Sequence, residues 1–449
     1  MSQSVSNQPP LRILLDGRKL GDGGIGIYIQ NLIDGLLLER ARGFPLEITL
    51  IVSESKDPVS QNILNSWKGK LKVVKDGAKK YSSDEYFMMP RRLRSVIAQS
   101  DVYHSPHYTL PGQFKKSRLL PFVRKSIPSV VTVHDAIHLM APENLSQKFF
   151  GGLLIKSAVR RANHVITVSG ASLSRLSRLF PGVAISVVPN ALAKGIGLKS
   201  LAEVQRVVKK FDLIQPYVIF VGSDRPHKGY FEMIEALSKL EEHKPMVVIV
   251  GERFSDSAKQ FATSKLGAKR VRFVGSIESA DLAALYNGAR AVMVPSRIEG
   301  FGLVALEALA AGAPLVCSPE ASLREVAGNC AWYADSFSAA DFSIAMQSCF
   351  DERELAEEKA TLGIEQAKEF SCEKVAAGHI QVYLSVLSAN RAKAFVQQSQ
   401  SILSYGNYES EELGPEIVFN ALEAAPEDTE SVETMLSSGN LPPSSNVFY

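Results

Sequence analysis

Residues 291–312 read AVMVPSRIEGFGLVALEALAAG. The apolar run 291–296 predicts a buried strand, and the alanine- and leucine-rich run 301–311 predicts a helix that begins after a glycine-containing turn. Glu299 and Glu307 place one carboxylate on each side of the helix start. We therefore expect a ligand site at this turn.

The start of this helix suits a phosphate. Its exposed N–H groups carry the positive end of the helix dipole, and Gly300 and Gly302 let a ligand approach the backbone closely. If the segment is helical from Glu299, the rise per residue separates Glu299 and Glu307 by roughly 12 Å. In glycoside hydrolases, the two carboxylates that act on one glycosidic bond lie roughly 5–9.5 Å apart, which is closer. The larger separation suits two carboxylates that bind opposite ends of one ligand. The alternative is an ordinary strand–helix unit with structural glycines and solvated glutamates.

The composition is typical of a globular protein with two domains. The chain has 449 residues, of which 45% are hydrophobic and 22% charged. Its N-terminus is polar and lacks the apolar segment of a signal peptide, and no stretch approaches the roughly 18 apolar residues of a membrane span. We therefore expect a cytoplasmic protein.

Cysteines and charges exclude two further classes. The cysteines have neither paired spacing nor a nearby histidine pattern, so we expect reduced, buried thiols and neither a disulfide framework nor a zinc site at Cys317, Cys330, Cys349 and Cys372. The formal net charge is +3, yet nine Asp or Glu residues and no Lys or Arg follow Lys393. The rest of the chain is therefore basic, and its end is acidic.

Short apolar runs, rich in β-branched residues, alternate with helical patterns such as 28–38 in the first half of the chain. This alternation predicts βαβ units around a parallel sheet, and hence a first Rossmann-like domain. Strands are expected at 11–16, 46–53, 71–74, 101–104, 129–134, 164–169 and 185–189.

The pattern restarts after a linker that we expect over 191–210. It predicts a second Rossmann-like domain that faces the first across a cleft. Strands are expected at 217–222, 246–251, 271–275, 291–296 and 314–318, and helices near 230–240, 281–287 and 301–311.

The end of the chain changes character. An amphipathic helix is expected over 372–387, and the acidic, serine-rich residues beyond it have too little apolar surface to order, apart from a transient helix at 415–424. We thus expect an α/β fold with a disordered N-terminus at 1–10, domains at 11–195 and 196–370, a returning helix at 371–390 and a disordered tail at 391–449.

A glycine-rich loop, LGDGGIGIY at 20–28, follows the first predicted strand and opens a helix. Gly21, Gly23 and Gly26 have the G-x-G-x-x-G spacing, but short glycine motifs give many false positives, so we do not interpret the loop as a dinucleotide fingerprint. A loop that approaches a phosphate still fits this position, and a mobile surface loop is the alternative.

Polar side chains follow two further predicted strands. In SDRPHKG at 223–229, Lys228 and Arg225 are candidates to neutralise a diphosphate, because ligands of open α/β sheets bind at the C-terminal strand edge. A solvated basic loop is the alternative. His134 ends a strand of the first domain, where it either faces the cleft or caps the next turn.

Together these residues resemble the family 4 glycosyltransferases, retaining enzymes of the GT-B type with two facing Rossmann-like domains, also called glycosyl transferases group 1. The resemblance covers residues 11–388 and is strongest over 281–334. Glu299 and Glu307, separated by seven residues, match the acidic motif of the family.

The resemblance implies a hexosyltransferase of polysaccharide biosynthesis. Its donor would be mannose or glucose on GDP or UDP, its acceptor a glycan, a lipid-linked glycan or another hydroxyl compound, and it would need no metal or bound cofactor. The first domain would bind the acceptor and the second the donor. Retention is pictured as attack on the same face, in which a donor phosphate oxygen accepts the acceptor's proton.

Site residues follow from the same resemblance. Glu299 would hold hydroxyls of the donor sugar, Glu307 the ribose, Lys228 the diphosphate, and His134 would lie near the reacting sugar, so that Glu299, His134 and Lys228 are the catalytic candidates. Further donor contacts are implied at Gly23, Gly24, Gly26, Ser223, Arg225, Gly300, Phe301, Gly302 and Leu303.

One departure concerns the second cation. Ser223 and His227 stand where family members usually offer basic residues, and Arg225 stands where an acid is common. Either Arg225 reaches inward, or His227 contributes when it is protonated.

A basic surface is expected on the first domain, where the stretch 114–125 joins Arg91, Arg92 and Arg94. It would suit anionic lipid headgroups and a peripheral position on the inner face of the membrane, and a soluble face is the alternative. Nucleic-acid binding is not expected, because the cations are not interleaved with aromatics. The acidic tail is a candidate site for a protein partner.

Two other functions stay open at this point. One is a nucleotide-sugar epimerase of similar shape, which would convert a donor without releasing the sugar. The other is a non-catalytic sugar-nucleotide sensor or assembly subunit, which the irregular loop 223–227 favours. The presence of Glu299, Glu307, Lys228 and His134 together favours a transferase.

Overall fold

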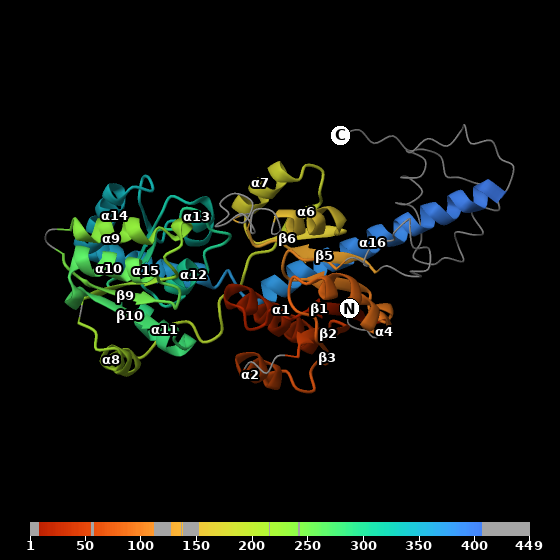
Figure 1. Cartoon of the computed structure of the whole chain (residues 1–449), viewed down its shortest axis with the longest axis horizontal. Coiled ribbons are helices and arrows are strands. Elements are labelled where there is room, and N and C mark those ends of the chain that lie inside the picture. Colours follow the sequence, from red (N-terminus) through yellow and green to blue (C-terminus); the bar gives the residue numbers. More distant parts are fainter. Residues whose placement is uncertain are drawn as a thin grey trace, which may run out of the picture. The chain divides into compact units, whose positions relative to one another are not determined.

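The computed structural model describes residues 9–54, 58–111, 127–135, 137, 152–214, 216–240 and 243–405. The chain divides into a compact unit, Met1–Val386, and a second unit, Leu387–Tyr449. Two parallel sheets follow one another along the first unit (Figure 1). We call the part around the first sheet the first lobe and the part around the second sheet the second lobe.

Seven parallel strands form the sheet of the first lobe, in the spatial order β3-β2-β1-β4-β5-β6-β7. All seven correspond to predicted runs, and the fully buried β4 and β5 show why: strands covered on both faces need nearly continuous apolar sequence. Leu14, Tyr103 and Val131 are fully buried in its core. The strands are β1 (Leu11–Asp16), β2 (Leu46–Ser53), β3 (Lys72–Asp76), β4 (Val102–Ser105), β5 (Ser129–Thr132), β6 (His164–Thr167) and β7 (Ile185–Val187).

Six parallel strands form the sheet of the second lobe, in the order β10-β9-β8-β11-β12-β13. Five were predicted, and β13 was missed because its two residues are too few to show a period. The strands are β8 (Tyr217–Val221), β9 (Met246–Val250), β10 (Val271–Gly275), β11 (Ala291–Val294), β12 (Leu315–Cys317) and β13 (Trp332–Tyr333). The predicted α/β fold with two Rossmann-like sheets is confirmed.

Helices connect the strands of both sheets, as parallel pairing requires. In the first lobe they are α1 (Gly23–Ala41), α2 (Pro58–Ser66), the π-helix η1 (Asp84–Met88), α3 (Met89–Arg92), α4 (Arg94–Ala98), α6 (Gly152–Arg161) and α7 (Gly170–Leu179). Those that follow are α8 (Leu201–Lys210), the 3₁₀ turns η4 (Pro226–Lys228) and η5 (Ala268–Arg270), α9 (Tyr230–Ser238), α10 (Asp256–Leu266), α11 (Ser279–Asn287), α12 (Leu303–Ala310), α13 (Ala321–Ala327), α14 (Ala339–Asp351), α15 (Arg353–Ala367) and α16 (Cys372–Tyr405).

The predicted linker 191–210 is wrong in its second half, which forms α8. Ser200 and Glu203 make a reciprocal capping box at its start, a signal that the sequence carried. Arg206 and Lys210 each lie 2.6 Å from a carboxylate oxygen of Asp281 on α11. Both cations are about half exposed, so these pairs orient α8 rather than stabilise it strongly.

Helix α12 begins at Leu303, two residues later than predicted. Gly302 precedes it with φ 111°, a left-handed conformation that favours glycine. Glu299 therefore lies in the loop before the helix, and the separation calculated for a helix from Glu299 onward does not apply. The two carboxylates still flank the helix start.

Helix α16 continues to Tyr405, whereas the sequence analysis ended it at 387 and expected disorder from 391. Residues 388–405 contain neither glycine nor proline, so nothing in their backbone chemistry stops a helix. The rest of the predicted tail, the transient helix at 415–424 and most of the predicted disordered N-terminus lie outside the described residues.

The cysteines are free thiols, as expected. Cys317, Cys330 and Cys349 are buried, and Cys372 is partly exposed. In the described part of the chain, no helix combines the length and the apolar character that crossing a bilayer requires.

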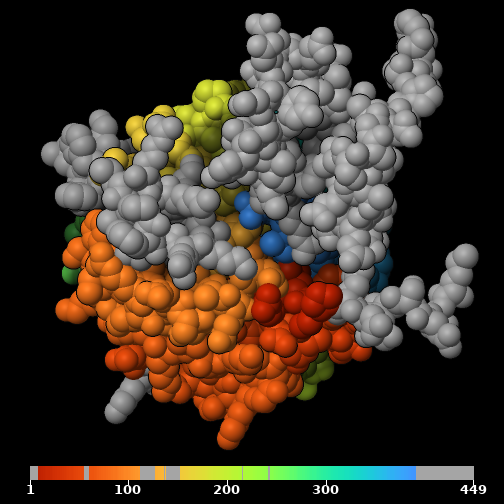
Figure 2. All heavy atoms as spheres, turned by 90° about the vertical axis from the view of Figure 1, so that its right-hand side faces the viewer, coloured from red at the N-terminus to blue at the C-terminus, as the bar shows by residue number. Residues whose placement is uncertain are grey.

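The expected basic surface is described only in part, because the stretch 114–125 lies outside the described residues. Arg92 is committed to ion pairs, with 2.8 Å between its guanidinium nitrogens and oxygens of both Asp76 and Asp84. Arg91 and Arg94 are exposed, in the orange region of the chain that contributes to the face in Figure 2. Arg92 is thus not available to a headgroup without breaking these pairs.

Candidate functional site

The two lobes meet at Gly300. A Cβ atom at this position would lie 2.4 Å from the backbone oxygen of His134, so only glycine fits without a shift. The carbonyl oxygen of Gly300 accepts hydrogen bonds from the hydroxyls of Ser169 at 2.6 Å and Ser172 at 3.0 Å. The turn that the sequence selected in the second lobe therefore packs against the end of β5 and the start of α7 in the first.

Helix α7 supplies further contacts to the second lobe. Its first N–H groups, from Gly170 and Ala171, donate to the carboxylate of Glu325 on α13 at 2.7 and 2.6 Å. Arg175 donates to the carbonyl oxygen of Glu299 at 3.1 Å and forms an ion pair with Glu320. None of these contacts was predicted, since no local pattern shows which carboxylate meets a helix start in another lobe.

Lys228 and Glu299 form the charged pair of the site. The ammonium nitrogen lies 2.8 Å from Oε2 of Glu299, and the two side chains are 25% and 19% exposed. Burial alone would raise the pKa of Glu299, but Lys228 and a hydrogen bond from Ser296 outweigh it and lower this pKa below its usual value. Lys228 is mostly buried and bonded directly to Glu299, so the solvated-loop alternative does not describe it.

The backbone around Lys228 is locked against β11. Gly229 has φ 66°, and a Cβ atom there would lie 2.1 Å from the carbonyl oxygen of Pro295. The N–H of Arg297 donates to the carbonyl oxygen of His227 at 2.7 Å. This close approach fixes the short η4 turn, and with it the position of Lys228 at the carboxyl end of the sheet.

The neighbours of Lys228 answer the question of the second cation in part. His227 is buried, and burial together with the charge of Lys228 lowers its pKa, so it is neutral at neutral pH. Ser223 is also buried at the end of β8. Arg225 is half-buried and has contacts of its own. The neutral ring of His227 leaves Arg225 as the candidate for the second cation.

The glycine loop of the first lobe lies at the start of α12. Gly23, Gly24 and Gly26 form the first turn of α1 rather than a free loop, and a Cβ atom on Gly26 would lie 2.2 Å from the carbonyl oxygen of Leu20. A Cβ atom on Gly24 would lie 3.4 Å from Cδ1 of Leu303. The structure thus brings this loop and the predicted phosphate turn together.

Glu307 lies deeper than the rest of the site. Its side chain is 7% exposed, and Oε2 accepts a hydrogen bond from the hydroxyl of Tyr286 at 2.9 Å. Burial raises the pKa of Glu307 to about 7, and this hydrogen bond only partly opposes it. The predicted alternative of a solvated glutamate is therefore wrong for Glu307.

His134 is half-buried beside Gly300. Its Nε2 donates to the carbonyl oxygen of Pro106 at 2.9 Å, and its ring meets the ring of Tyr28 edge to face at 4.7 Å. Burial lowers the pKa of His134, so Nδ1 is left with a lone pair at neutral pH. The backbone oxygen of His134 accepts a hydrogen bond from the hydroxyl of Ser172 on α7 at 3.4 Å. Most of the turn that His134 was expected to cap lies outside the described residues.

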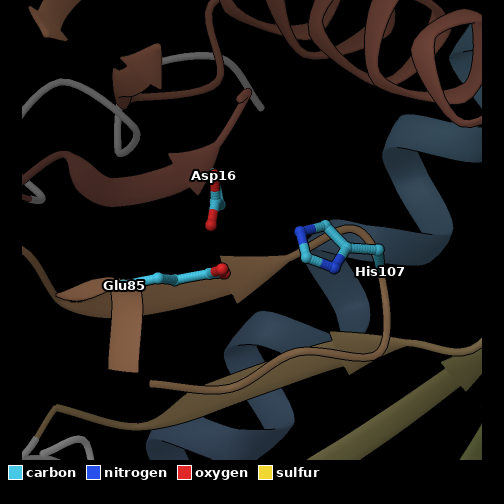
Figure 3. Close-up of side chains that lie close together, drawn as sticks. All are labelled: Asp16, Glu85 and His107. Carbon is cyan, nitrogen blue, oxygen red and sulfur yellow. The ribbon is translucent and has the colours of Figure 1, made fainter. Parts of the chain in front are cut away.

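Asp16, Glu85 and His107 form the one group in the described residues whose ligand atoms lie within 4.8 Å of one another (Figure 3). Arg18 already supplies the positive charge, with its guanidinium 2.6 Å from Asp16 and 2.8 Å from Glu85. Burial opposes ionisation of Asp16, but Arg18 dominates and lowers its pKa. We interpret the group as a buried ion-pair network, because Arg18 already pairs with both carboxylates.

Comparisons with known proteins agree with this geometry. Residues 202–366 match the family described as glycosyl transferases group 1, and residues 22–193 match glycosyltransferase family 4. A D-inositol 3-phosphate glycosyltransferase of Xylanimonas cellulosilytica is 30% identical over 349 residues, which span 70% of this chain and 79% of that protein. The chain belongs to the family 4 glycosyltransferases.

Two further likenesses support this assignment. O-antigen chain mannosyltransferase B of Escherichia coli is 28% identical over 292 residues, covering 63% of this chain and 74% of that protein. The structure of sucrose-phosphate synthase from Thermosynechococcus elongatus covers 84% of this chain and 100% of its own, with a TM-score of 0.65 and 18% identity. The family 4 glycosyltransferase described here is thus a hexosyltransferase with the GT-B fold.

Proposed function

We propose that the protein moves mannose or glucose from a GDP- or UDP-linked donor to a hydroxyl of a glycan, with retention at the anomeric carbon and without a metal ion. The second lobe would bind the donor and the first the acceptor. The observation that supports this most strongly is the partly exposed Lys228–Glu299 pair, 2.8 Å apart, in which Glu299 lies in the loop that leads into α12. The likeness to an O-antigen chain mannosyltransferase favours mannose.

The proposed donor would bind with its diphosphate, hexose and ribose each at a different part of the site. Its diphosphate would lie between Lys228 and the first N–H groups of α12, where the positive end of the helix dipole adds to the ammonium charge. The hexose would then extend toward Glu299 and His134. The ribose would reach inward to Glu307, whose protonated carboxyl group both donates and accepts hydrogen bonds near neutral pH.

Transfer requires charge stabilisation above all. As the bond between the anomeric carbon and the phosphate oxygen breaks, negative charge grows on the nucleoside diphosphate, and Lys228, Arg225 and the dipole of α12 offset it. The acceptor oxygen bonds to the anomeric carbon from the same face and gives its proton to a phosphate oxygen. Neutral His134 would accept a hydrogen bond at Nδ1 from a sugar hydroxyl and so orient the hexose.

The acceptor is the least constrained part of this proposal. A glycan on a lipid carrier fits a basic first lobe, with exposed Arg91 and Arg94 near the headgroups, in a peripheral position on the inner face of the membrane. The acidic end of the chain would bind a protein partner. Sedimentation with vesicles that contain anionic lipid, compared with neutral vesicles, tests the membrane contact.

The proposed reaction is tested by steady-state transfer with Lys228→Ala and Glu299→Ala. Loss of one group that stabilises developing charge typically lowers kcat about 10²–10³-fold, and we expect this for Lys228→Ala. Exposed, partly paired Lys259 and Glu235 on the same lobe provide matched control variants, Lys259→Ala and Glu235→Ala. Circular dichroism checks that the variants fold.

Several outcomes would count against the proposal. Unchanged turnover in both site variants would show that Lys228 and Glu299 do not form the active site. Loss of activity with a chelator, and its recovery with a divalent cation, would contradict a metal-independent reaction. Conversion of the donor sugar without an acceptor, and without release of the sugar, would indicate an epimerase instead.

A further inference from the structure

Four hydrogen bonds between buried side chains form a continuous chain that joins α16 to the first lobe. The hydroxyl of Tyr383 lies 2.7 Å from Nδ1 of His104, and Nε2 of His104 lies 2.8 Å from the hydroxyl of Thr132. The hydroxyl of Thr132 lies 2.8 Å from that of Tyr28, which is 2.6 Å from Nε2 of His379. These five residues come from α1, β4, β5 and α16, and none is more than 1% exposed.

A fifth hydrogen bond fixes the protons at one end. Nδ1 of His379 lies 2.7 Å from the carbonyl oxygen of Val375, which can only accept, so this nitrogen carries the hydrogen. Burial lowers the pKa of His379 to about 4, so the ring is neutral at neutral pH. Its Nε2 must then accept the hydrogen of the Tyr28 hydroxyl.

The direction of every other bond follows. Because Tyr28 donates to His379, the hydroxyl of Thr132 must donate to Tyr28. Its own oxygen then accepts from Nε2 of His104, and burial keeps His104 neutral by lowering its pKa. Nδ1 of His104 is left to accept from the Tyr383 hydroxyl. The two histidines thus hold opposite tautomers, His379 with hydrogen on Nδ1 and His104 with hydrogen on Nε2.

This chain of hydrogen bonds passes beside the candidate active site at Tyr28. Tyr28 meets the ring of His134 edge to face at 4.7 Å, and His134 lies against Gly300 of the second lobe. The hydroxyl of Tyr28 is fixed by two partners at once, Thr132 and His379. The tyrosine ring that covers one side of His134 therefore has no freedom to rotate its hydroxyl end away.

Helix α16 follows the second lobe in the chain, yet it packs closely on α1. A Cβ atom on Gly35 of α1 would lie 2.1 Å from the carbonyl oxygen of Cys372, and one on Gly378 would lie 3.0 Å from Val188. Both glycines allow the close approach of α16 that brings His379 to Tyr28. Docking of α16 and the hydrogen-bond chain thus depend on each other.

We propose that Tyr28 and His379 are positioning residues for transfer: through the directed hydrogen-bond chain, docked α16 holds the ring of His134 in the orientation that a sugar hydroxyl needs. The part that concerns transfer rests on the proposed function of the site. The part that concerns the orientation of His134 does not.

The tautomers provide the first test. Full-length protein labelled with ¹⁵N-histidine reports by NMR which ring nitrogen of each histidine carries hydrogen, and the signals are assigned with His379→Gln and His104→Gln. We expect His379 with hydrogen on Nδ1 and His104 with hydrogen on Nε2 at neutral pH. The same tautomer in both, the reverse assignment, or a charged ring in either overturns the directed chain.

Orientation of His134 is the second test. Tyr28→Phe keeps the aromatic ring and removes only the hydroxyl, and His379→Leu removes the acceptor. Both should shift the ring signals of His134, whereas His243→Leu, a half-exposed histidine paired with Asp351 in the second lobe, should not. Unchanged His134 signals in Tyr28→Phe overturn the proposal even if His379→Leu fails to fold.

Kinetics provides the third test. Because a misplaced group costs up to about 100-fold, we expect kcat of Tyr28→Phe to fall at least tenfold with KM for the donor unchanged, and His379→Gln to recover part of the rate lost in His379→Leu. An equal loss in His379→Gln and His379→Leu, or an unchanged kcat in Tyr28→Phe, overturns the positioning role. If the wild-type protein transfers nothing, the proposed function fails, and the two NMR tests still decide the orientation of His134.

Discussion

At the scale of single residues, Glu307 carries the clearest consequence of burial. Its pKa is raised to about 7, so the native state keeps the proton between pH 4.5, the ordinary value, and pH 7, where the unfolded chain has released it. The native state then binds more protons than the unfolded chain, and stability falls as the pH rises through this window, by on the order of 3 kcal/mol.

Glu307→Gln, which cannot ionise, should lose this part of the pH dependence. We expect the free energy of unfolding of the wild type to fall, relative to Glu307→Gln, between pH 4.5 and 7 and then to level off. Urea denaturation at pH 5, 6, 7 and 8 measures the difference, with Glu235→Gln as an exposed control. A difference that is independent of pH would show that Glu307 is ionised throughout.

The sequence identified the residue types of the site but not their states. Lys228 was predicted as a cation at a strand edge and Glu299 as a carboxylate beside a helix start, and they form an ion pair. That Glu307 is buried under Tyr286, and that His227 is neutral, depends on neighbours distant in the sequence. Burial of one side chain by another segment leaves no local pattern.

At the scale of elements, the start of α7 is the point where one lobe caps a helix of the other. Glu325→Ala removes the acceptor of the N–H groups of Gly170 and Ala171, and loss of a helix cap typically costs about 1 kcal/mol. We expect the midpoint of denaturation to fall accordingly. Glu365→Ala, at an exposed pair on α15, is the control, and an equal midpoint for the two variants would contradict this role.

Strands were easier to predict than helix boundaries. Continuous apolar runs such as 217–222 and 246–251 correspond directly to β8 and β9, because both faces of these strands are covered. The start of α12 was predicted two residues early, since Phe301 fits a helical pattern while the left-handed Gly302 cannot be read from composition. Helix α8 was predicted to be part of the linker, although Ser200 and Glu203 have the sequence pattern of a capping box.

At the scale of the whole molecule, the two family matches end at residues 193 and 366, both before α16, and the compact first unit ends at Val386. A chain that ends after Tyr405 should therefore keep the melting temperature and the transfer rate of the full protein. A chain that ends before Cys372 loses His379 and Tyr383 and should unfold at a clearly lower temperature. Scanning calorimetry and transfer assays on both truncations measure this, and loss of transfer in the longer one would place residues beyond Tyr405 in the active site.

The arrangement of the two sheets was predictable because each lobe repeats the same strand–helix alternation. The contacts between the lobes were not, since they join single groups such as Gly300 and the backbone oxygen of His134, 166 residues apart in the printed sequence. The sequence does not show which segment each turn packs against. These contacts between distant segments bring the separate motifs together in one site.

Binding of nucleoside diphosphates tests the central claim most directly. Titration calorimetry of GDP and UDP with the wild-type protein, Lys228→Ala and Lys259→Ala needs no acceptor and no knowledge of the linkage. We predict that one of the two nucleotides binds the wild type and Lys259→Ala equally, and binds Lys228→Ala at least tenfold more weakly, because one charge-assisted contact is worth about 1.5–3 kcal/mol. Equal affinity for wild type and Lys228→Ala, or no binding of either nucleotide, would contradict a diphosphate held between Lys228 and the start of α12.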